Sequence, residues 1–277
     1  MKTRNLILLF AAALMMVASG CKKDDPSTSD DSLKDCQGNV YKTVKIGNQV
    51  WMAENLKCTQ YDTESELAGK TVPGYTKDPG LAPFCVNAYD YSTWDKGDGE
   101  ENPSNSQYTG KNLSKEQIAK LGCLYNWAAA VGLEDEAEIT SQATEFSKKR
   151  QGICPNGWHI PTAAEYTELA KAVGGEPRKE EGYIAYELIG KFLKSTSGWF
   201  EDGNGSDTFG FNALPAGQRG DVGKVYLVGK TTFLCTATPV DNSVVTVFNV
   251  NNQESVFYQL DDTVIKEEAA AVRCVKN

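Results

Sequence analysis

The sequence is poor in the residue types that most enzyme centres use. It has 277 residues but a single histidine, His159. Ser-His-Asp and Cys-His catalysis both need an imidazole, so any such chemistry would depend on this one residue. No Cys-x-x-Cys pair occurs either, and structural zinc sites are usually built from such pairs and histidines. The sequence therefore predicts no zinc site.

Positive charge and long apolar runs are also scarce. The chain has 28 Lys and Arg against 37 Asp and Glu, a net charge of −9. An acidic protein repels the phosphates of nucleic acids, so nucleic acid is not expected as a partner. Beyond residue 20 no apolar run approaches the roughly 18 residues of a membrane-spanning helix.

The N-terminus has the pattern of an export signal. Two basic residues precede an apolar run from Leu6 to Ala18, which is too short to span a membrane. Small residues then lead into Cys21, as in the lipobox of bacterial lipoproteins. We expect residues 1–20 to be cleaved and the Cys21 thiol to carry acyl chains that anchor the protein in the membrane. The alternative is an ordinary secretory signal with a chance cysteine.

A polar segment follows the lipidation site. Residues 21–35 are rich in Ser, Asp and Lys, so they cannot bury a core and should form a flexible tether. The Lys-Lys-Asp-Asp directly after Cys21 resembles the surface-export signal of some Gram-negative lipoproteins, although a solvated tether would have the same composition. We expect an outer-membrane lipoprotein exposed on the cell surface, with residues 36–277 forming one domain.

Seven cysteines remain once Cys21 is lipidated. Cysteines of exported proteins usually pair as disulfides, and an odd number leaves at least one free or intermolecular. The seven are Cys36, Cys58, Cys85, Cys123, Cys154, Cys235 and Cys274. Their spacing alone does not assign the pairs.

Local patterns in the first half of the chain predict a hairpin, a long irregular region and a helix. Alternating residues over 40–56, with Gly47-Asn48 between them, predict the hairpin. Residues 57–111 have no regular pattern, and within them residues 95–107 should be an exposed insertion. A capping box and apolar residues at helical spacing predict a helix over residues 113–132. Gly122 weakens this helix, and the alternative is two short helices.

The second half predicts two more helices and then strands. Thr162 and Glu165 form a capping box for one helix, which Gly174-Gly175 ends, and a further helical pattern covers residues 188–193. Strand patterns follow over residues 224–240, 244–250, 254–260 and 271–275. Together the elements predict an α+β domain with mainly antiparallel strands.

Five separated motifs point to one family. They are "GNVYKTVKIGNQVWMAENL", "LYNWAAA", "CPNGWHIPTAAEYTEL", "FGFNALPAGQRG" and "VRCVKN". In this order, and from about Gly38 to the C-terminus, they resemble the Fibrobacter succinogenes major paralogous domain (FISUMP). Such domains occur mostly in bacterial lipoproteins and cell-surface proteins. The resemblance implies a fold and a location, but no reaction.

The resemblance also implies an architecture. The family is distantly similar to the C-type-lectin-like fold and its formylglycine-generating-enzyme branch, which have a twisted antiparallel sheet, two or three helices and long loops. In those folds the N- and C-terminal strands meet. At the start of the predicted helix, Tyr166 stands where the relatives have Trp. The chain departs from the family in its long insertion and in "FLCTATP", which places Cys235 in an unusual position.

A disulfide between Cys154 and Cys274 follows from the same resemblance, because both lie in family motifs and lectin-like folds commonly tie the last strand to a cysteine near a helix. It would close a loop of about 120 residues, worth roughly 4–5 kcal/mol in the chain-entropy model. Pairing Cys274 in this way leaves no cysteine pair for formylglycine-type oxidase chemistry. The remaining five cysteines stay unassigned.

His159 itself lies in "GWHIPT", between apolar residues and just before a helix cap. We interpret it as a buried imidazole that fixes the turn; the alternative is a catalytic base. The acidic runs at residues 134–138 and 266–268 have the pattern of solvated charges. Neither run offers the carboxylate pair of a glycosidase.

The best candidate binding segment runs from Trp199 to Gly220. Its oxygen-bearing side chains and neighbouring aromatic and basic residues are Trp199, Asp202, Asn204, Ser206, Asp207 and Arg219. The spacing resembles the first half of a calcium loop, but Ala213 replaces the distal Glu of an EF-hand. The alternative is an Asx-rich turn before a strand at residues 209–211. Arg219 could contact an acidic ligand or pair with a carboxylate. Calcium is the only cofactor that the sequence suggests.

These observations favour a non-catalytic binding module for a glycan or a protein ligand, displayed on the membrane through its lipid anchor. The sequence lacks the Glu-Pro-Asn and Gln-Pro-Asp triplets of calcium-dependent lectins. A cell-envelope or glycan-processing hydrolase is one alternative. A structural component of a surface assembly is the other.

Overall fold

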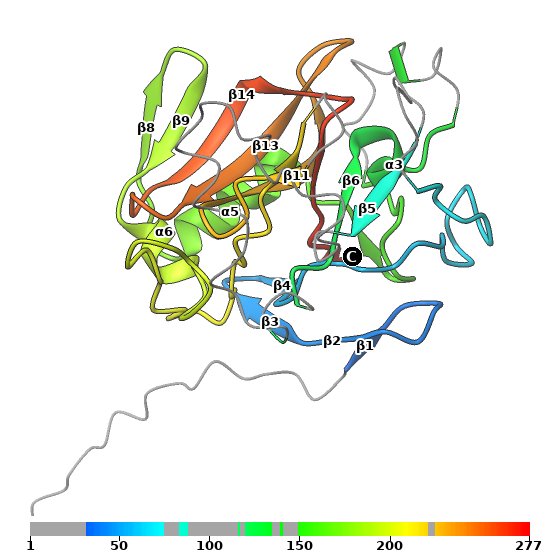
Figure 1. Cartoon of the computed structure of the whole chain (residues 1–277), viewed down its shortest axis with the longest axis horizontal. Helices are drawn as coiled ribbons and strands as arrows, with labels where there is room; N and C mark the ends of the chain where they lie inside the picture. The colour runs from blue at the N-terminus through cyan, green and yellow to red at the C-terminus, as the bar shows by residue number, and fades with distance from the viewer. Residues whose placement is uncertain are drawn as a thin grey trace, which may run out of the picture.

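The computed structural model describes residues 32–74, 83–87, 116, 120–134, 139–140, 149–220 and 225–277 (Figure 1). The signal peptide, the lipidation site Cys21, the tether up to residue 31 and the insertion at residues 95–107 lie outside the described residues. Those expectations therefore stay predictions. Leu33–Lys34, which the sequence places in the tether, form strand β1 and pair with β2 (Val40–Tyr41).

A large sheet forms the centre of the molecule. Its strands are β5 (Cys85–Asn87), β6 (Cys123–Asn126), β8 (Pro177–Glu180), β9 (Tyr183–Tyr186), β10 (Gln218–Arg219), β11 (Val225–Tyr226), β12 (Thr231–Pro239), β13 (Val244–Asn251), β14 (Phe257–Ile265) and β15 (Ala269–Ala271). The order is β11-β10-β15-β12-β13-β14-β9-β8, with β6 beside β15 and β5 beside β6. Among the described strands only β12 and β15 pair in parallel.

A second sheet brings the two ends of the domain together. It has the order β3-β4-β16-β7, with β3 at Thr43–Ile46, β4 at Gln49–Met52, β7 at Trp158–His159 and β16 at Val275–Lys276. The hairpin expected from the sequence is confirmed as β3 and β4, with Gly47 at φ 59° in the turn. Val275 pairs with Trp51 on one side and with His159 on the other.

Helices α3 (Trp127–Val131), α5 (Ala163–Ala172) and α6 (Ile189–Leu193) complete the described elements. The predicted capping box of α5 is confirmed: Thr162 Oγ1 accepts from Glu165 N at 3.2 Å, and Glu165 Oε2 accepts from Thr162 N at 2.9 Å. The fold is therefore α+β, as expected. No helix in the described part of the chain is long and apolar enough to cross a membrane.

The helix expected over residues 113–132 is wrong for its central part. Residues 123–126 form strand β6, which lies between β5 and β15, and only then does α3 begin. The residues of β6 are buried throughout, and a run buried on all sides can be helix or strand by its pattern alone. The side chain of Asn126 stabilises the change from strand β6 to helix α3, because its Oδ1 accepts hydrogen bonds from Phe84 N and from Ala129 N.

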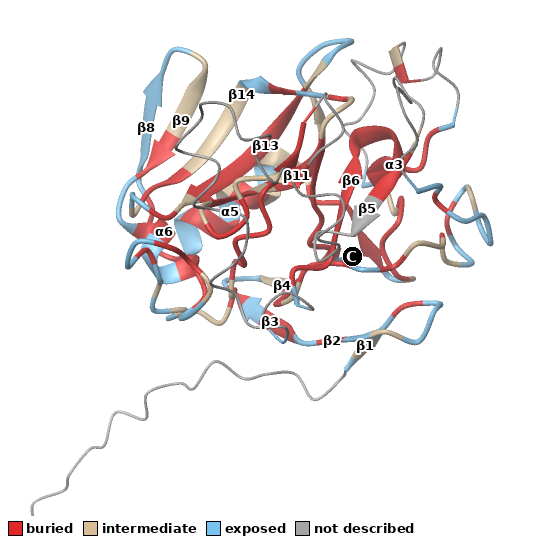
Figure 2. Ribbon diagram, in the orientation of Figure 1, coloured by how far each residue is buried: buried red, intermediate tan, exposed pale blue. Residues whose placement is uncertain are grey.

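The expected strand at residues 209–211 is also absent. Gly210 has φ 72°, and the segment forms a turn in the described structure. Conversely, the β8-β9 hairpin has no clear sequence signal. Its outer strand begins with Pro177 and is exposed along its length (Figure 2), as suits the edge of a sheet.

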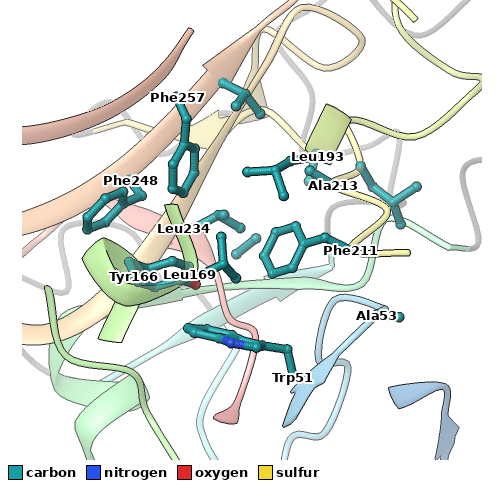
Figure 3. Packing of buried hydrophobic residues seen from close by; sticks show 14 of the residues in the cluster. Trp51, Ala53, Tyr166, Leu169, Leu193, Phe211, Ala213, Leu234, Phe248 and Phe257 are labelled. Atoms are coloured by element: carbon teal, nitrogen blue, oxygen red, sulfur yellow. The ribbon is translucent and has the colours of Figure 1, made fainter. Parts of the chain in front are cut away.

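Five aromatic rings form a column through the core (Figure 3). From Phe257 of β14 the column passes to Phe248 of β13 and Tyr166 of α5, with ring centroids 4.9 and 4.7 Å apart. It continues to Trp51 of β4 at 4.8 Å and to Phe211 at 5.9 Å. The column packs α5 against the large sheet and joins both to the hairpin and to the segment around residue 211.

The predicted disulfide is present. Cys154 and Cys274 are bonded, with Cα atoms 5.9 Å apart and a sequence separation of 120. The bond joins the segment before β7 to the residue before β16. Cys36, Cys58, Cys85, Cys123 and Cys235 carry thiols.

Candidate functional site

His159 is held on both sides in the interior. Only 1% of the residue is exposed. Its Nδ1 lies 2.6 Å from Asn277 Oδ1, and its Nε2 lies 2.8 Å from Glu165 Oε1. Neither partner is a hydroxyl or a thiol that the imidazole could activate as a nucleophile. The geometry supports the structural interpretation, in which His159 connects β7, the start of α5 and the C-terminal residue.

Glu165 is occupied in the same way. Burial raises the pKa of this carboxyl, but hydrogen bonds from His159 and from the backbone and hydroxyl of Thr162 outweigh that effect, so the net pKa lies below the usual value. Lys149 Nζ adds a more distant charge at 3.7 Å. A carboxylate that serves as part of a helix cap and stays ionised is a poor general acid.

The acidic run at residues 266–268 differs from its expected exposure. Lys266 is buried, contrary to the solvated run expected there: its Nζ donates to Ile139 O at 3.1 Å and lies 4.3 Å from the centroid of the Trp127 ring. Glu134 forms an exposed ion pair with Lys70. Residues 135–138 lie outside the described part of the chain.

The segment from Trp199 to Asn212 is fastened to α6. The last carbonyl groups of a helix have no hydrogen-bond partner within the helix. Here backbone N–H groups of the loop donate to the carbonyls at this end of α6. Gly205 N donates to Ser195 O at 2.8 Å, Ser206 N to Lys191 O at 2.9 Å, and Asp207 N to Lys194 O at 3.1 Å. The loop and the helix therefore form one unit.

Three of the four proposed calcium ligands, Asn204, Ser206 and Asp207, direct their side-chain oxygens to neighbouring groups of the loop, whereas Asp202 is exposed. Asn204 Oδ1 accepts from Trp199 N at 3.0 Å, and Asp207 Oδ1 accepts from Asn212 N at 2.6 Å. Ser206 Oγ lies 2.7 Å from Thr208 Oγ1. These contacts support the Asx-rich turn. Among the described residues no three His, Cys, Asp or Glu side chains are grouped so as to hold a metal ion.

Trp199 and Arg219 lie inside the molecule. Trp199 Nε1 donates to Ser195 Oγ at 3.0 Å, and the Lys194 ammonium lies 5.2 Å from the ring centroid. Arg219 is 2% exposed; its Nη1 donates to Glu267 O at 2.9 Å, and its guanidinium lies over Phe84. Both residues support the loops around them. Of the two alternatives for Arg219, contact with an external acidic ligand does not fit its burial, and the hydrogen bond from Nη1 goes to the backbone carbonyl of Glu267.

An apolar surface next to the loop was not expected from the sequence. Leu188 is 69% exposed and Phe192 is 37% exposed. The half-buried ring of Phe209 meets Phe192 edge-on, with centroids 6.3 Å apart. We call these three residues the apolar loop face. The sequence places Leu188 and Phe192 in a helical pattern, but α6 has only five residues, so part of that pattern faces solvent.

The backbone around the apolar loop face is unusual. Five of the six described non-glycine residues with positive φ lie between residues 188 and 212; they are Leu188, Glu201, Asp202, Asp207 and Asn212, at 65°, 54°, 57°, 45° and 55°. Such conformations cost free energy for residues other than glycine, and they tend to gather at functional segments. At Leu188, the N-cap residue of α6, a side chain that is 69% exposed stands on such a backbone.

Arg273 holds the end of the loop from within. This fully buried guanidinium donates to Asn55 Oδ1 at 2.9 Å, to Asn212 O at 2.6 Å and to Phe211 O. It also lies over the Phe211 ring, 4.7 Å from its centroid. Burial lowers the pKa of Arg273 to about 10, so the group stays charged at neutral pH. The loop is thus anchored at both ends.

The fold and this site define an α+β domain that presents a firmly held loop. Residues 44–276 match the model of the Fibrobacter succinogenes major domain. Since the match covers most of the chain, the protein belongs to this family. No curated protein and no solved structure matches it.

Proposed function

We propose that this protein is a non-catalytic binding module that recognises its ligand through the apolar loop face. The observation that carries the proposal is the exposure of Leu188, whose φ is positive, and of Phe192 on α6, beside a loop that is hydrogen-bonded to that helix. Exposed apolar side chains gathered on a shaped loop are typical of interaction sites.

A protein partner fits this surface better than a glycan. Phe192 and Phe209 meet edge-on, and Leu188 is exposed on the residue before α6. Apolar side chains of this kind suit contact with another apolar surface. Sugar recognition relies more on hydrogen-bonding side chains directed outward. The oxygens of Asn204 and Asp207 are bonded within the loop instead.

The cellular setting belongs to the proposal. We infer an outer-membrane lipoprotein, anchored through Cys21 and exposed on the cell surface, from the signal motif and from the usual location of the family. Metabolic labelling with a palmitate analogue should mark the full chain and fail to mark Cys21→Ala. Protease treatment of intact cells should degrade a surface-exposed protein and spare an internal one.

A lectin-like architecture is proposed as well. It is supported by the pairing of β4 with β16, which brings the N- and C-terminal strands together, and by the disulfide beside β16. An experimental structure that superposes the β3-β4-β16-β7 sheet and α5 on a lectin-like domain would test it.

Site-directed cross-linking in cells tests the binding proposal. We expect the full chain with a photo-reactive residue at position 192 to cross-link to one discrete protein, and Leu188→Asp to abolish the product. Val240→Asp is the matched control, because Val240 is 45% exposed but follows β12, away from α6 in the sequence. Its cross-link should be unchanged.

Other outcomes would favour the other functions. Binding on a glycan array that Leu188→Asp removes would make the ligand a sugar. Turnover of a fluorogenic hydrolase substrate that His159→Ala removes, without loss of thermal stability, would make the protein an enzyme. Cross-links only between copies of the chain would indicate a structural surface assembly.

A further inference from the structure

Two thiols meet where the chain enters the folded domain. Cys36 lies in the turn between β1 and β2 and is exposed, whereas Cys58 follows β4 and is buried. Their sulfur atoms are 3.8 Å apart. Both also approach one carbonyl oxygen, that of Gln60, at 3.3 and 3.1 Å. Two thiols in contact need only side-chain rotation and a small shift to reach a disulfide bond of about 2.05 Å.

We propose that Cys36 and Cys58 form a second disulfide-forming site, oxidised by exchange with a protein or small-molecule disulfide of the cell envelope. The inference is independent of the proposed binding function. It concerns how the first strands are fixed to the rest of the domain.

The surrounding hydrogen bonds hold the two cysteines in position. Asp35 is buried, and its carboxylate accepts from Gln37 N, Asn39 N and the Tyr41 hydroxyl at 3.0, 2.9 and 2.6 Å. On the other side Gln37 Oε1 accepts from Thr59 N at 2.8 Å. The residues directly after Cys36 and Cys58 are therefore hydrogen-bonded to each other. Forming the disulfide then requires little further ordering of the chain.

The exchange balances in two steps. The Cys36 thiolate attacks one sulfur of the external disulfide, which forms a mixed disulfide and releases one thiolate. The Cys58 thiolate then attacks the Cys36 sulfur, which forms the internal bond and releases the second thiolate. Cys36 and Cys58 lose two electrons and two protons in total; the external disulfide gains the electrons, and the protons pass to the released thiolates or to water.

The local charges set the rate. Burial raises the pKa of the Cys36 thiol, and the negative charges of Asp62 and Asp35 raise it further. Burial likewise raises the pKa of Cys58 well above its usual value, with Asp35 adding to the effect. The Tyr41 hydroxyl donates a hydrogen bond to the Asp35 carboxylate, and the Lys57 ammonium lies over the Tyr41 ring. Because only thiolates attack, the exchange should be slow at neutral pH and accelerate up to about tenfold per pH unit.

The other thiols are arranged differently. Cys85 and Cys123 lie on neighbouring strands, but Cys85 is opposite Tyr125 and Cys123 is opposite Asn87. Cys235 is buried in β12. Cys85 therefore serves as a control position, since its replacement should leave the chemistry of Cys36 and Cys58 unchanged.

Peptide mapping of the full chain tests the proposal. The detergent-extracted protein is incubated with oxidised glutathione at pH 7 and pH 8, quenched with acid, alkylated and digested with trypsin without reduction. We expect tryptic peptides 35–42 and 58–70 to be joined in most monomers, sooner at pH 8, and to separate on reduction. Cys85→Ser should give the same product, and Cys36→Ser should give none.

The contrary results are equally distinct. Alkylation of both Cys36 and Cys58 after prolonged oxidation would overturn the proposal, as would a disulfide from either residue to another cysteine or to a second chain. Hydrogen exchange gives a second readout that needs no variant. Oxidation should slow the exchange of the Asp35 and Gly38 amides, which close the turn, by roughly tenfold, and unchanged exchange would count against a bond there.

Discussion

Buried cations are the most unusual side chains of this domain. Lys194, Lys266 and Arg273 are each at most 3% exposed, yet each donates to backbone carbonyls and lies over an aromatic ring. Charge-assisted hydrogen bonds and cation–π contacts offset part of the cost of removing a charge from water. These hydrogen bonds join residues that are at least 57 positions apart in the sequence.

Removing the Arg273 side chain should be strongly destabilising. Arg273→Ala leaves the acceptors of Asn55, Phe211 and Asn212 without their donor and opens a cavity, so we expect the free energy of unfolding to fall by about 3–5 kcal/mol. Chemical denaturation of the full chain measures this. Arg178→Ala is the control: Arg178 pairs with Glu180 and Glu187 in solvent, and its loss should leave the denaturation midpoint unchanged.

Glu165 should make stability depend on pH. Its pKa is lowered in the folded state, so its stabilising effect is fully present above the unfolded pKa and is lost as the pH falls through the folded pKa. We expect Glu165→Gln to be less stable than the wild type at pH 6, and the difference to shrink toward pH 3. Denaturation curves at both pH values check this. A difference that does not change with pH would show that the carboxylate charge is not involved.

At the level of elements, local signals in the sequence predict well only where neighbours in the chain decide the outcome. The Gly47-Asn48 hairpin and the Thr162–Glu165 capping box are confirmed because a few consecutive residues specify each of them. Strand β6 was wrongly assigned because its burial comes from distant strands.

The candidate site shows the same limit. The sequence identified the loop from Trp199 onward and its Asx-rich character, but it placed Trp199 and Arg219 among the ligand contacts although both are buried. It also missed Leu188 and Phe192. Exposure is decided by the packing of the whole domain, and a short apolar pattern carries no information on which of its residues remain uncovered.

Gly152 lies against the backbone of α3, so its substitution tests how closely these segments pack. Gly152 has φ 55°, and a Cβ there would collide with the carbonyl oxygen of Ala130. We expect Gly152→Ala to lower the free energy of unfolding by more than about 3 kcal/mol, because backbone would have to move. Gly157 also has positive φ, 76°, but nothing lies within 4 Å of a Cβ, so Gly157→Ala should cost only about 1 kcal/mol. Equal losses in thermal denaturation would contradict this account.

At the scale of the whole molecule, the Cys154–Cys274 disulfide joins segments that are 120 residues apart. A covalent link between distant segments stabilises mainly by restricting the unfolded chain. The aromatic column acts together with the disulfide. It connects the β3-β4-β16-β7 sheet, which the disulfide also reaches, to α5 and to the loop.

Loss of this disulfide should lower the free energy of unfolding by about 2–5 kcal/mol. The double variant Cys154→Ala with Cys274→Ala measures the effect by urea denaturation. Cys235→Ala, which removes a buried thiol that is not disulfide-bonded, should cost only about 1 kcal/mol. A double variant as stable as the Cys235→Ala protein would show that the bond contributes little.

The position of β16 has a consequence for biosynthesis. Trp51 and His159 both pair with Val275 in the smaller sheet, so that sheet closes only after residue 275 has left the ribosome. Until then the β3-β4 hairpin exposes an unpaired edge, which invites aggregation. Newly made chains should therefore depend on chaperones that keep them apart until the residues of β16 have been synthesised.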